Sequence, residues 1–353
     1  IGCGGIANGK HMPSLKKIPE VEMVAFCDII PERAEKAKEE YGTPDAAVYE
    51  DYKELLQDKS IDVVHVCTPN RSHSFITIDA LEAGKHVMCE KPMAKTSEEA
   101  KAMCDAAKRT GKLLSIGYQN RQCAGNRYAK QLCEDGELGE IYFAKAFALR
   151  RRAVPTWGVF LNEYEQGGGP LIDIGTHALD LTLWMMNNYK PKMVVGNTFR
   201  KLADQKNTAN AWGDWDPKEF TVEDSAFGYI VMQNGAVITL ESSWALNIAK
   251  SNEAKFLLCG DKGGLDTLDG VTVNFVKNGR QVIAKPDMEA GGVAFYDGAS
   301  DSDPSVLDAR IWIDACLGKG EQCVYPEQAY TVTRILEAIY TSAKTGQPVY
   351  FDD

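Results

Sequence analysis

Asp173 and His177 lie four residues apart in an apolar segment, and their side chains suit proton transfer. The segment Leu171–Trp184 is apolar on almost every face, so we expect an interior helix there. Residues four apart share a helix face, which puts Asp173 and His177 on one stripe with Asp180. Buried polar groups cost free energy unless they have partners or a chemical role. Histidine, with an unperturbed pKa of about 6.5, is suited to act as a general base.

A glycine-rich turn opens the chain and indicates dinucleotide binding. Gly2-x-Gly4-x-x-Ala7 matches the G-x-G-x-x-A fingerprint, in which glycines allow a tight turn and let the backbone approach a pyrophosphate. The motif alone is weak, but strands and helices alternate regularly after it. The residues predicted to hold the cofactor at this turn are Gly2, Gly4, Gly5, Ile6 and Ala7.

Asp28 is the candidate for ribose recognition. It follows a strand-like run, Val21–Cys27, at about the place where an acid reaches the ribose hydroxyls. A carboxylate repels a 2'-phosphate, so Asp28 favours NAD. Arg33 is a nearby cation, and NADP therefore remains an alternative.

The first 121 residues read as a doubly wound parallel sheet that binds NAD. We expect strands at Val63–Cys67, His86–Cys89 and Leu113–Ile116, and helices at Pro31–Gly42 and Ser72–Ala83. Thr96 and Glu99 predict a capping box at the start of a further helix. Ligands bind beyond the carboxyl ends of such strands. The candidates there are Thr68, Asn70, His73, Glu90, Lys91, Gln119 and Asn120.

Two of these candidates have competing interpretations. Lys91 could place an ammonium beside a reacting hydroxyl, or it could be a solvated surface lysine. His73 could touch the cofactor, or it could only begin a helix. His11, His65 and His86 look structural.

Residues 122–353 predict an α+β domain for substrate binding and oligomerisation. A helix near Cys123–Asp135 precedes a strand at Ile141–Leu149, and a closing helix is expected around Glu327–Thr345. Between them, turn signals separate further strands expected at Met193–Leu202, Ala226–Met232, Ala236–Trp244, Ala254–Cys259 and Val271–Val276. This pattern predicts one large, open, mostly antiparallel sheet. Its uncovered face predicts a homo-oligomer, a dimer, tetramer or larger.

Aromatic residues in two loops suggest a sugar site. Arg152 and Trp157, with the loop that holds Trp212 and Trp215, combine rings with polar groups. The alternative is that the rings anchor loops and that Arg150–Arg152 is a solvated basic run.

Composition excludes several classes of partner. The net charge of −11 disfavours nucleic acid and anionic membranes, and no apolar run is long enough to span a bilayer. The ten cysteines are scattered singly without metal-type spacing, which predicts reduced thiols, no metal site and a cytoplasmic location. The chain begins at Ile1 without Met, so a targeting segment stays an open question.

Several motifs together resemble the glucose-fructose oxidoreductase / inositol dehydrogenase / MocA (Gfo/Idh/MocA) family. They are the glycine turn, Thr68-Pro69-Asn70 with His73, Glu90-Lys91-Pro92, and Gly168-Gly169 leading to Asp173, Gly175 and His177. The resemblance covers nearly the whole chain. It implies an N-terminal Rossmann domain, a C-terminal mixed sheet and a nicotinamide cofactor between them. It also implies that Lys91, Asp173 and His177 are catalytic, with Asn70, Glu90 and Gln119 near the nicotinamide.

The function expected from these residues is NAD-dependent oxidation of a secondary hydroxyl in a sugar, glycoside or inositol. His177 would act as the base, Asp173 would orient it or bind a neighbouring hydroxyl, and Lys91 would stabilise the alkoxide-like oxygen. The residues predicted to contact substrate are Lys91, Asn120, Arg152, Trp157, Asp173 and His177. An NAD-dependent glycosidase and a non-catalytic NAD- and sugar-sensing regulator are the alternatives. Net NADH production separates the dehydrogenase from the glycosidase.

Overall fold

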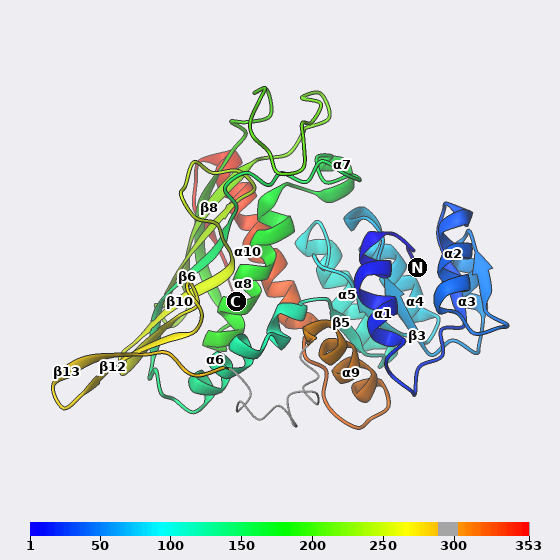
Figure 1. Ribbon diagram of the computed structural model, residues 1–353, viewed down its shortest axis with the longest axis horizontal. Coiled ribbons are helices and arrows are strands. Elements are labelled where there is room, and N and C mark those ends of the chain that lie inside the picture. Colours follow the sequence, from blue (N-terminus) through cyan, green and yellow to red (C-terminus); the bar gives the residue numbers. More distant parts are fainter. Residues whose placement is uncertain (289–302, 353) are drawn as a thin grey trace. The chain divides into compact units, whose positions relative to one another are not determined.

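The computed structural model describes residues 1–288 and 303–352, which divide into two compact units (Figure 1). The first unit comprises Ile1–Gln122 and Asp301–Tyr330, and the second comprises Cys123–Ser300 and Thr331–Asp353. A late segment of the chain therefore belongs to the first unit. Each unit is described below by itself.

The first unit is built on parallel strands, as the sequence predicts. Its strands are β1 (Ala25–Cys27), β2 (Ala47–Tyr49), β3 (Val63–Val66), β4 (His86–Cys89) and β5 (Leu114–Ile116). β1 pairs with β2, and β3, β4 and β5 pair in that order, all in parallel. Gly2 N donates to Cys27 O, and Cys67 N donates to Ile1 O, each at 2.8 Å. The first two residues thus bridge the two groups of strands.

The three helices expected in the first unit are present as α2 (Pro31–Tyr41), α4 (His73–Glu82) and α5 (Ser97–Thr110). The unit also contains helices that were not expected: η1 (Ala7–His11), α1 (Met12–Leu15), α3 (Tyr52–Gln57), η2 (Asn70–Ser72), η3 (Gln119–Gln122) and α9 (Pro304–Cys316). The capping box of Thr96 and Glu99 is confirmed at the start of α5. The strand expected over Val21–Cys27 is shorter, because only Ala25–Cys27 pairs with a neighbour.

The second unit contains one nine-stranded sheet in the order β13-β12-β11-β10-β6-β9-β8-β7-β14. Its strands are β6 (Ile141–Leu149), β7 (Pro191–Phe199), β8 (Ser225–Met232), β9 (Val237–Ser243), β10 (Asn252–Gly260), β11 (Gly263–Asp266), β12 (Thr272–Lys277), β13 (Arg280–Ala284) and β14 (Val349–Tyr350). β6 and β9 run parallel, and the other neighbours are antiparallel. The expectation of a large, mostly antiparallel sheet is confirmed.

Helices cover one face of this sheet. The helices of the second unit are α6 (Ala124–Glu134), α7 (Glu163–Gln166), η4 (Leu171–Gly175), α8 (Thr176–Met186) and α10 (Pro326–Thr345). Of these, η4, α8 and α10 lie against the strands. Figure 1 shows α8 and α10 on the same side of the strands. Alternate residues of β6, namely Ala144, Ala146 and Ala148, are fully buried, because their small side chains let a helix approach closely.

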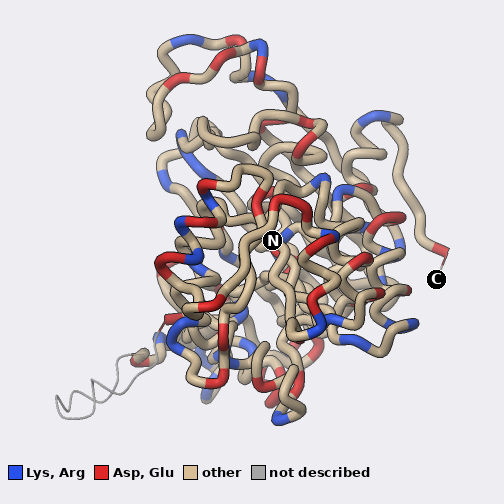
Figure 2. Tube along the Cα trace, turned by 90° about the vertical axis from the view of Figure 1, so that its right-hand side faces the viewer, with Lys and Arg blue, Asp and Glu red and all other residues tan. Residues whose placement is uncertain are grey.

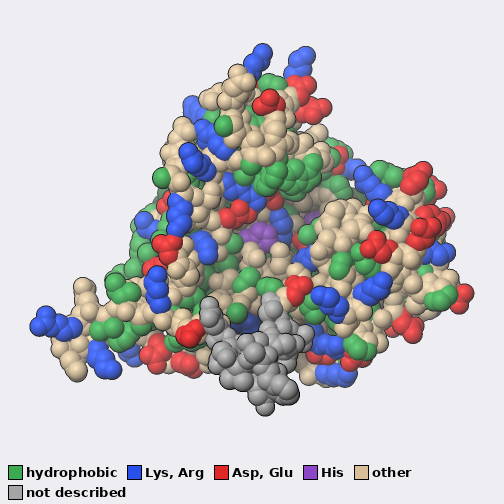
Figure 3. Space-filling view, in the orientation of Figure 1, with side chains coloured by type: hydrophobic (Ala, Val, Ile, Leu, Met, Phe, Trp, Pro, Cys, Tyr) green, Lys and Arg blue, Asp and Glu red, His purple; other side chains and the backbone are tan. Residues whose placement is uncertain are grey.

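The surface carries charges of both signs. Acidic and basic residues are interspersed along the trace in Figure 2 and on the face seen in Figure 3. All ten cysteines are free, and five of them are buried. Among the helices in the described part of the chain, none has the length and apolar character needed to cross a bilayer.

Candidate active site

Asp173 and His177 are the two partly exposed residues of a run, Leu171–Asp180, in which the other members are buried. The sequence predicted an interior helix here, and this is confirmed. A polar side chain at the open side of an otherwise buried helix is accessible to a ligand while the helix itself is held rigidly by packing. The two residues therefore have the placement that a catalytic pair needs.

The prediction of a regular helix is wrong for the first turn of this segment. η4 (Leu171–Gly175) is a π-helix, and the α-helix α8 begins only at Thr176. A π-turn holds more residues than an α-turn. The α-helical spacing assumed for Asp173, His177 and Asp180 therefore does not apply across η4. Asp180, expected on the same stripe, is 1% exposed. Short π-helical turns inside helices occur frequently at functional sites.

A buried indole fixes the carboxylate of Asp173. Trp244 Nε1 donates a hydrogen bond to Asp173 Oδ2 at 2.9 Å, and the Trp244 side chain is fully buried at the end of β9. Because a buried ring has little rotational freedom, this bond holds Asp173 in one orientation. Trp244 thus acts on the candidate pair from 71 residues further along the chain.

Glu223 holds the backbone that leads into η4. Its carboxylate accepts hydrogen bonds from Gly169 N (2.8 Å), Leu171 N (3.1 Å) and the hydroxyl of Tyr340 (2.8 Å). The two backbone donors, Gly169 and Leu171, sit at the start of the helical segment, where N–H groups lack partners within the helix. Burial raises the pKa of Glu223 to about 7, although the three donors oppose this.

The glycines before η4 are required by this contact. A Cβ on Gly168 would lie 2.0 Å from the hydroxyl oxygen of Tyr340, and one on Gly169 would lie 2.1 Å from the carbonyl oxygen of Glu223. Neither side chain can therefore be added without displacing the anchor. The reason for these glycines lies in contacts with residues more than 50 positions away, which the sequence alone does not show.

In the first unit the glycine turn and Asp28 lie together, as the fingerprint requires. Cys3 N donates to Asp28 Oδ2 at 2.8 Å, and Ile30 N donates to Asp28 Oδ1 at 2.9 Å. Gly2 has φ +84°, and a Cβ there would lie 2.7 Å from Cys67 O. By contrast, a Cβ on Gly4 or Gly5 would meet nothing within 4 Å.

The turn is therefore open where a pyrophosphate must approach the backbone. Ile6 is 42% exposed beside these glycines, whereas Ala7 is buried at the start of η1. An acid next to a glycine turn that leads into a helix N-terminus is the arrangement that holds a dinucleotide. The residues present thus fit an NAD-type cofactor.

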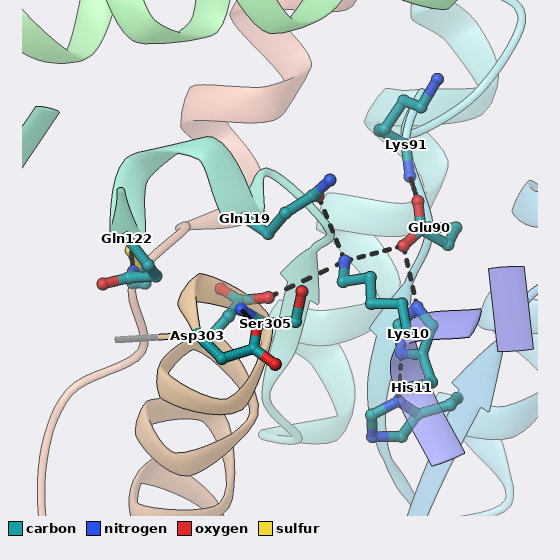
Figure 4. A network of polar contacts seen from close by, with 11 residues as sticks. Lys10, His11, Glu90, Lys91, Gln119, Gln122, Asp303 and Ser305 are labelled. Carbon is teal, nitrogen blue, oxygen red and sulfur yellow. Dashed lines mark hydrogen bonds and ion pairs between the residues drawn. The ribbon is translucent and has the colours of Figure 1, made fainter. Parts of the chain in front are cut away.

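Glu90 is the centre of a buried polar network in the first unit (Figure 4). Its Oε1 accepts from Lys10 Nζ at 2.9 Å and contacts His11 Nε2 at 2.8 Å, and its Oε2 accepts from the backbone N of Lys91 at 3.1 Å. Burial alone raises the pKa of Glu90, but the Lys10 ammonium and His11 hold that pKa well below its usual value. Lys10 Nζ also donates to Gln119 Oε1 at 3.1 Å.

This network joins the ends of β4 and β5 to the helix after the glycine turn. In Figure 4 the side chain of Lys91 points away from Glu90, while its backbone faces the carboxylate. Lys91 itself is partly exposed, as are Gln119 and Asn120. The structure thus brings together in the first unit the candidates that follow neighbouring strands.

His73 connects two of the candidate loops. Its ring nitrogens lie 2.7 Å from Pro92 O and 2.8 Å from Thr68 O, and the side chain is buried. Burial lowers the pKa of His73, against the effect of the two carbonyl groups. Asn70 is 9% exposed and begins η2 between these loops. His11 and His65 are in contact through their Nδ1 atoms, in keeping with the structural role predicted for them.

Arg152 and Trp157 lie in the second unit, in the segment after β6. The guanidinium of Arg152 donates to Thr208 O at 3.1 Å and to Asn247 Oδ1, so it cross-links loops. Trp157 is 51% exposed. Five further residues contact the candidate site residues or their anchors and were not selected from the sequence. They are Lys10, Glu223, Trp244, Asp308 and Tyr340. No local motif marks them, because their partners are distant in the sequence.

Comparison with known proteins identifies the family. Residues 1–118 match a family model described as an oxidoreductase family with an NAD-binding Rossmann fold. Residues 130–351 match the model of that family's C-terminal alpha/beta domain. The chain therefore belongs to the Gfo/Idh/MocA oxidoreductase family, and it is an oxidoreductase with an NAD-binding domain.

Among its relatives is D-glucoside 3-dehydrogenase of Escherichia coli (strain K12). The two are 38% identical over 99% of this chain and 95% of the relative. Levoglucosan dehydrogenase of Pseudarthrobacter phenanthrenivorans is 29% identical over 67% of this chain and 62% of the relative. A solved structure of levoglucosan dehydrogenase in complex with NADH and levoglucosan has the same fold, with a TM-score of 0.83 at 22% identity over 100% of this chain and 98% of that one.

The raised pKa of Glu223 predicts how stability depends on pH. A carboxyl whose pKa is raised from 4.5 to about 7 on folding stabilises the folded state fully below pH 4.5, and this contribution is lost as pH rises through 7. Glu223→Gln cannot titrate at this position and serves as the reference. The free energy of unfolding of the wild type minus that of Glu223→Gln should therefore fall by roughly 3 kcal/mol between pH 5 and pH 8. Urea unfolding at several pH values measures it.

Glu219→Gln, a change at an exposed carboxyl of the same unit, is the control for loss of one charge. The account of Glu223 would be contradicted if the free energy of unfolding of the wild type minus that of Glu223→Gln stayed constant or increased as pH rises.

Proposed function

We propose that this protein is an NAD-dependent dehydrogenase that oxidises a secondary hydroxyl of a sugar, and that its substrate is a D-glucoside. The observation that carries the proposal is the pair Asp173 and His177, the partly exposed residues of an otherwise buried helix. Support for the substrate comes from the relative named D-glucoside 3-dehydrogenase, which is 38% identical over 99% of this chain.

In this proposal three side chains act on one hydroxyl group. His177 takes the hydroxyl proton at a ring nitrogen, and Asp173, oriented by Trp244, binds a neighbouring hydroxyl or orients the imidazole. The ammonium of Lys91 stabilises the negative charge that develops on the oxygen. Glu90 positions Lys91 through its backbone N. Bound NAD supplies the carbon that accepts the hydride.

The first unit would hold the cofactor through the glycine turn and the loops that follow its strands. Gly2, Gly4, Gly5, Ile6 and Ala7 would face the pyrophosphate, since the space at Gly4 and Gly5 is open. Thr68, Asn70, His73, Glu90 and Gln119 would hold or support the nicotinamide half. Asp28 would bind the ribose hydroxyls, which selects NAD over NADP. Asn120, Arg152 and Trp157 would contact the substrate.

We also propose that a second copy of the chain covers the open face of the nine-stranded sheet. The strand register puts Lys145, Thr239, Tyr229 and Val195 in one row on the face opposite Ala144 and Ala146. Phe143, Val237 and Val231 form the neighbouring row. Tyr229 and Val195 are 43% and 38% exposed. A sheet face on which large side chains such as Tyr229 and Val195 stay exposed is typical of a protein interface.

The dehydrogenase activity is tested by NADH formation from a panel of D-glucosides, free sugars and inositols. We expect net NADH with at least one D-glucoside. His177→Asn and Lys91→Met should each lower kcat by about a hundredfold or more, because the proton acceptor or the charge-stabilising group is lost. NAD binding, measured by calorimetry, should be largely retained.

Lys101→Met, at an exposed lysine on α5, is the matched control and should keep the wild-type rate. Full activity in either site variant would rule out the catalytic assignment. Release of the aglycone without net NADH would favour the glycosidase instead.

Cofactor selectivity tests the role of Asp28. Asp28→Ser removes the carboxylate that repels a 2'-phosphate, so the ratio of kcat/KM with NAD to kcat/KM with NADP should fall by about tenfold. Steady-state kinetics with both cofactors measure this ratio, and Asp45→Ser, at an exposed acid of the same unit, is the control. An unchanged ratio would show that Asp28 does not select the cofactor.

Light scattering after size-exclusion chromatography tests the covered sheet face. The wild type should have the mass of a dimer or larger assembly, and Tyr229→Arg should shift it toward the monomer, because a buried unpaired charge opposes association. Leu317→Arg, at a residue 49% exposed in the first unit, should leave the mass unchanged. A monomeric wild type would refute the proposed interface.

A further inference from the structure

Three aromatic side chains of the second unit form an exposed cluster, which we call the aromatic corner: Trp157, Phe160 and Trp212. The rings of Trp157 and Trp212 meet nearly at right angles, with centroids 4.8 Å apart and an interplanar angle of 84°. The Trp157 and Phe160 centroids are 5.8 Å apart. Trp157 is 51% exposed and Trp212 is 44% exposed. Large rings in contact at the surface leave apolar area open to a ligand.

Hydrogen bonds between the two loops hold the corner in place. Val154 N donates to Asn210 Oδ1 at 2.8 Å, and Asn210 Nδ2 donates back to Val154 O at 3.0 Å. Thr156 Oγ1 donates to the carbonyl of Trp212 at 2.6 Å. The two indoles are thus presented by cross-linked segments, which lowers the entropy cost of binding a ligand between them.

The loop that carries Trp212 has a separate anchor in Trp215. Trp215 Nε1 donates to Ala203 O at 2.9 Å, and its ring stacks on the buried Phe220 with centroids 5.5 Å apart. The loop is therefore fixed to the interior by Trp215. Trp157 and Trp212, by contrast, remain 51% and 44% exposed after their contacts with each other and with Arg150.

Arg150 links the corner to the electrostatic surroundings of Asp173. The guanidinium carbon of Arg150 lies 5.4 Å from the centroid of the Trp212 ring, and Arg150 makes a two-pronged ion pair with Glu253 at 2.6 and 2.7 Å. Burial lowers the pKa of Arg150, but Glu253 and the negative charge of Asp173 outweigh it and raise that pKa. The charge of Asp173 is thus part of the electrostatic surroundings of Arg150.

The backbone makes the same connection. Arg150 N donates to Ser243 O at 2.8 Å, and Ala153 N donates to Trp244 O at 2.9 Å. Trp244 is the residue whose indole holds Asp173. The segment that carries Trp157 is therefore fastened to the same strand end as the candidate catalytic carboxylate.

We propose that the aromatic corner binds the group attached to the anomeric oxygen of a glycoside, when that group is a flat ring. This inference rests on the proposed function, and it defines the substrate further: a glucoside with a ring-bearing aglycone, in preference to one with a small aglycone. An aromatic ring packs offset or edge-on against indoles and buries apolar area in doing so. The sugar ring then lies beside Asp173 while the aglycone ring extends to Trp157 and Trp212.

The test compares phenyl and methyl D-glucosides, each as both anomers, as substrates for NAD reduction. For the wild type, kcat/KM should be about tenfold higher with the better phenyl glucoside than with its methyl counterpart, mainly through a lower KM. In Trp157→Ala and in Trp212→Ala this phenyl-to-methyl ratio should fall to about one. Trp157→Phe and Trp212→Phe keep an aromatic ring, so their phenyl-to-methyl ratios should lie between those of the alanine variants and the wild type.

Tyr350→Ala removes a ring that is 65% exposed on β14 and is the matched control, with an unchanged ratio. Thermal unfolding checks that each variant is folded. A wild type that oxidises both glucosides with equal kcat/KM, or alanine variants that keep the wild-type ratio, would overturn the aglycone site and leave the proposed function standing. A wild type that reduces NAD with none of these glucosides would contradict the glucoside proposal and this inference with it.

Discussion

Two buried carboxylates set the geometry of the candidate functional segments, one in each unit. A carboxylate removed from water is costly unless its oxygens are fully bonded, so the segments that supply its donors must come together when the chain folds. Glu90 gathers Lys10, His11 and the backbone of Lys91. Glu223 gathers Tyr340 and the backbone that leads into the helix of Asp173 and His177. In each case the anchored segment is the one that carries candidate catalytic residues.

The two carboxylates differ in the charge of their partners, and their pKa values shift in opposite directions for that reason. Glu90 is buried beside a lysine ammonium and His11, which outweigh the effect of burial and hold its pKa low. Glu223 has neutral donors, so burial dominates and its pKa rises to about 7. The loop before Lys91 is thus held by an ion pair across the pH range near neutrality, whereas the start of η4 is held by a group that titrates there.

The features that the sequence predicts depend on residues that are neighbours in the chain. The capping box of Thr96 and Glu99, the helix ended by Gly42, and the strand at Ile141–Leu149 are local patterns, and each is present. The return of α9 to the first unit and the bond from Trp244 to Asp173 leave no local pattern, since the latter joins residues 71 positions apart. The π-turn before Thr176 was missed because the segment is apolar on almost every face, so its pattern does not distinguish a π-turn from an α-turn. The roles of Lys91, Asp173 and His177 stay predictions.

The central claim is that the residues around Asp173 and His177 serve a hydride transfer from a sugar carbon to NAD. The most direct measurement uses a methyl D-glucoside deuterated at its ring carbons, with the isotope content of the accumulated NADH read by mass spectrometry. The account predicts that NADH gains one deuterium and forms more slowly than with unlabelled substrate. Unlabelled NADH, or deuterium released to water without NADH formation, would contradict it.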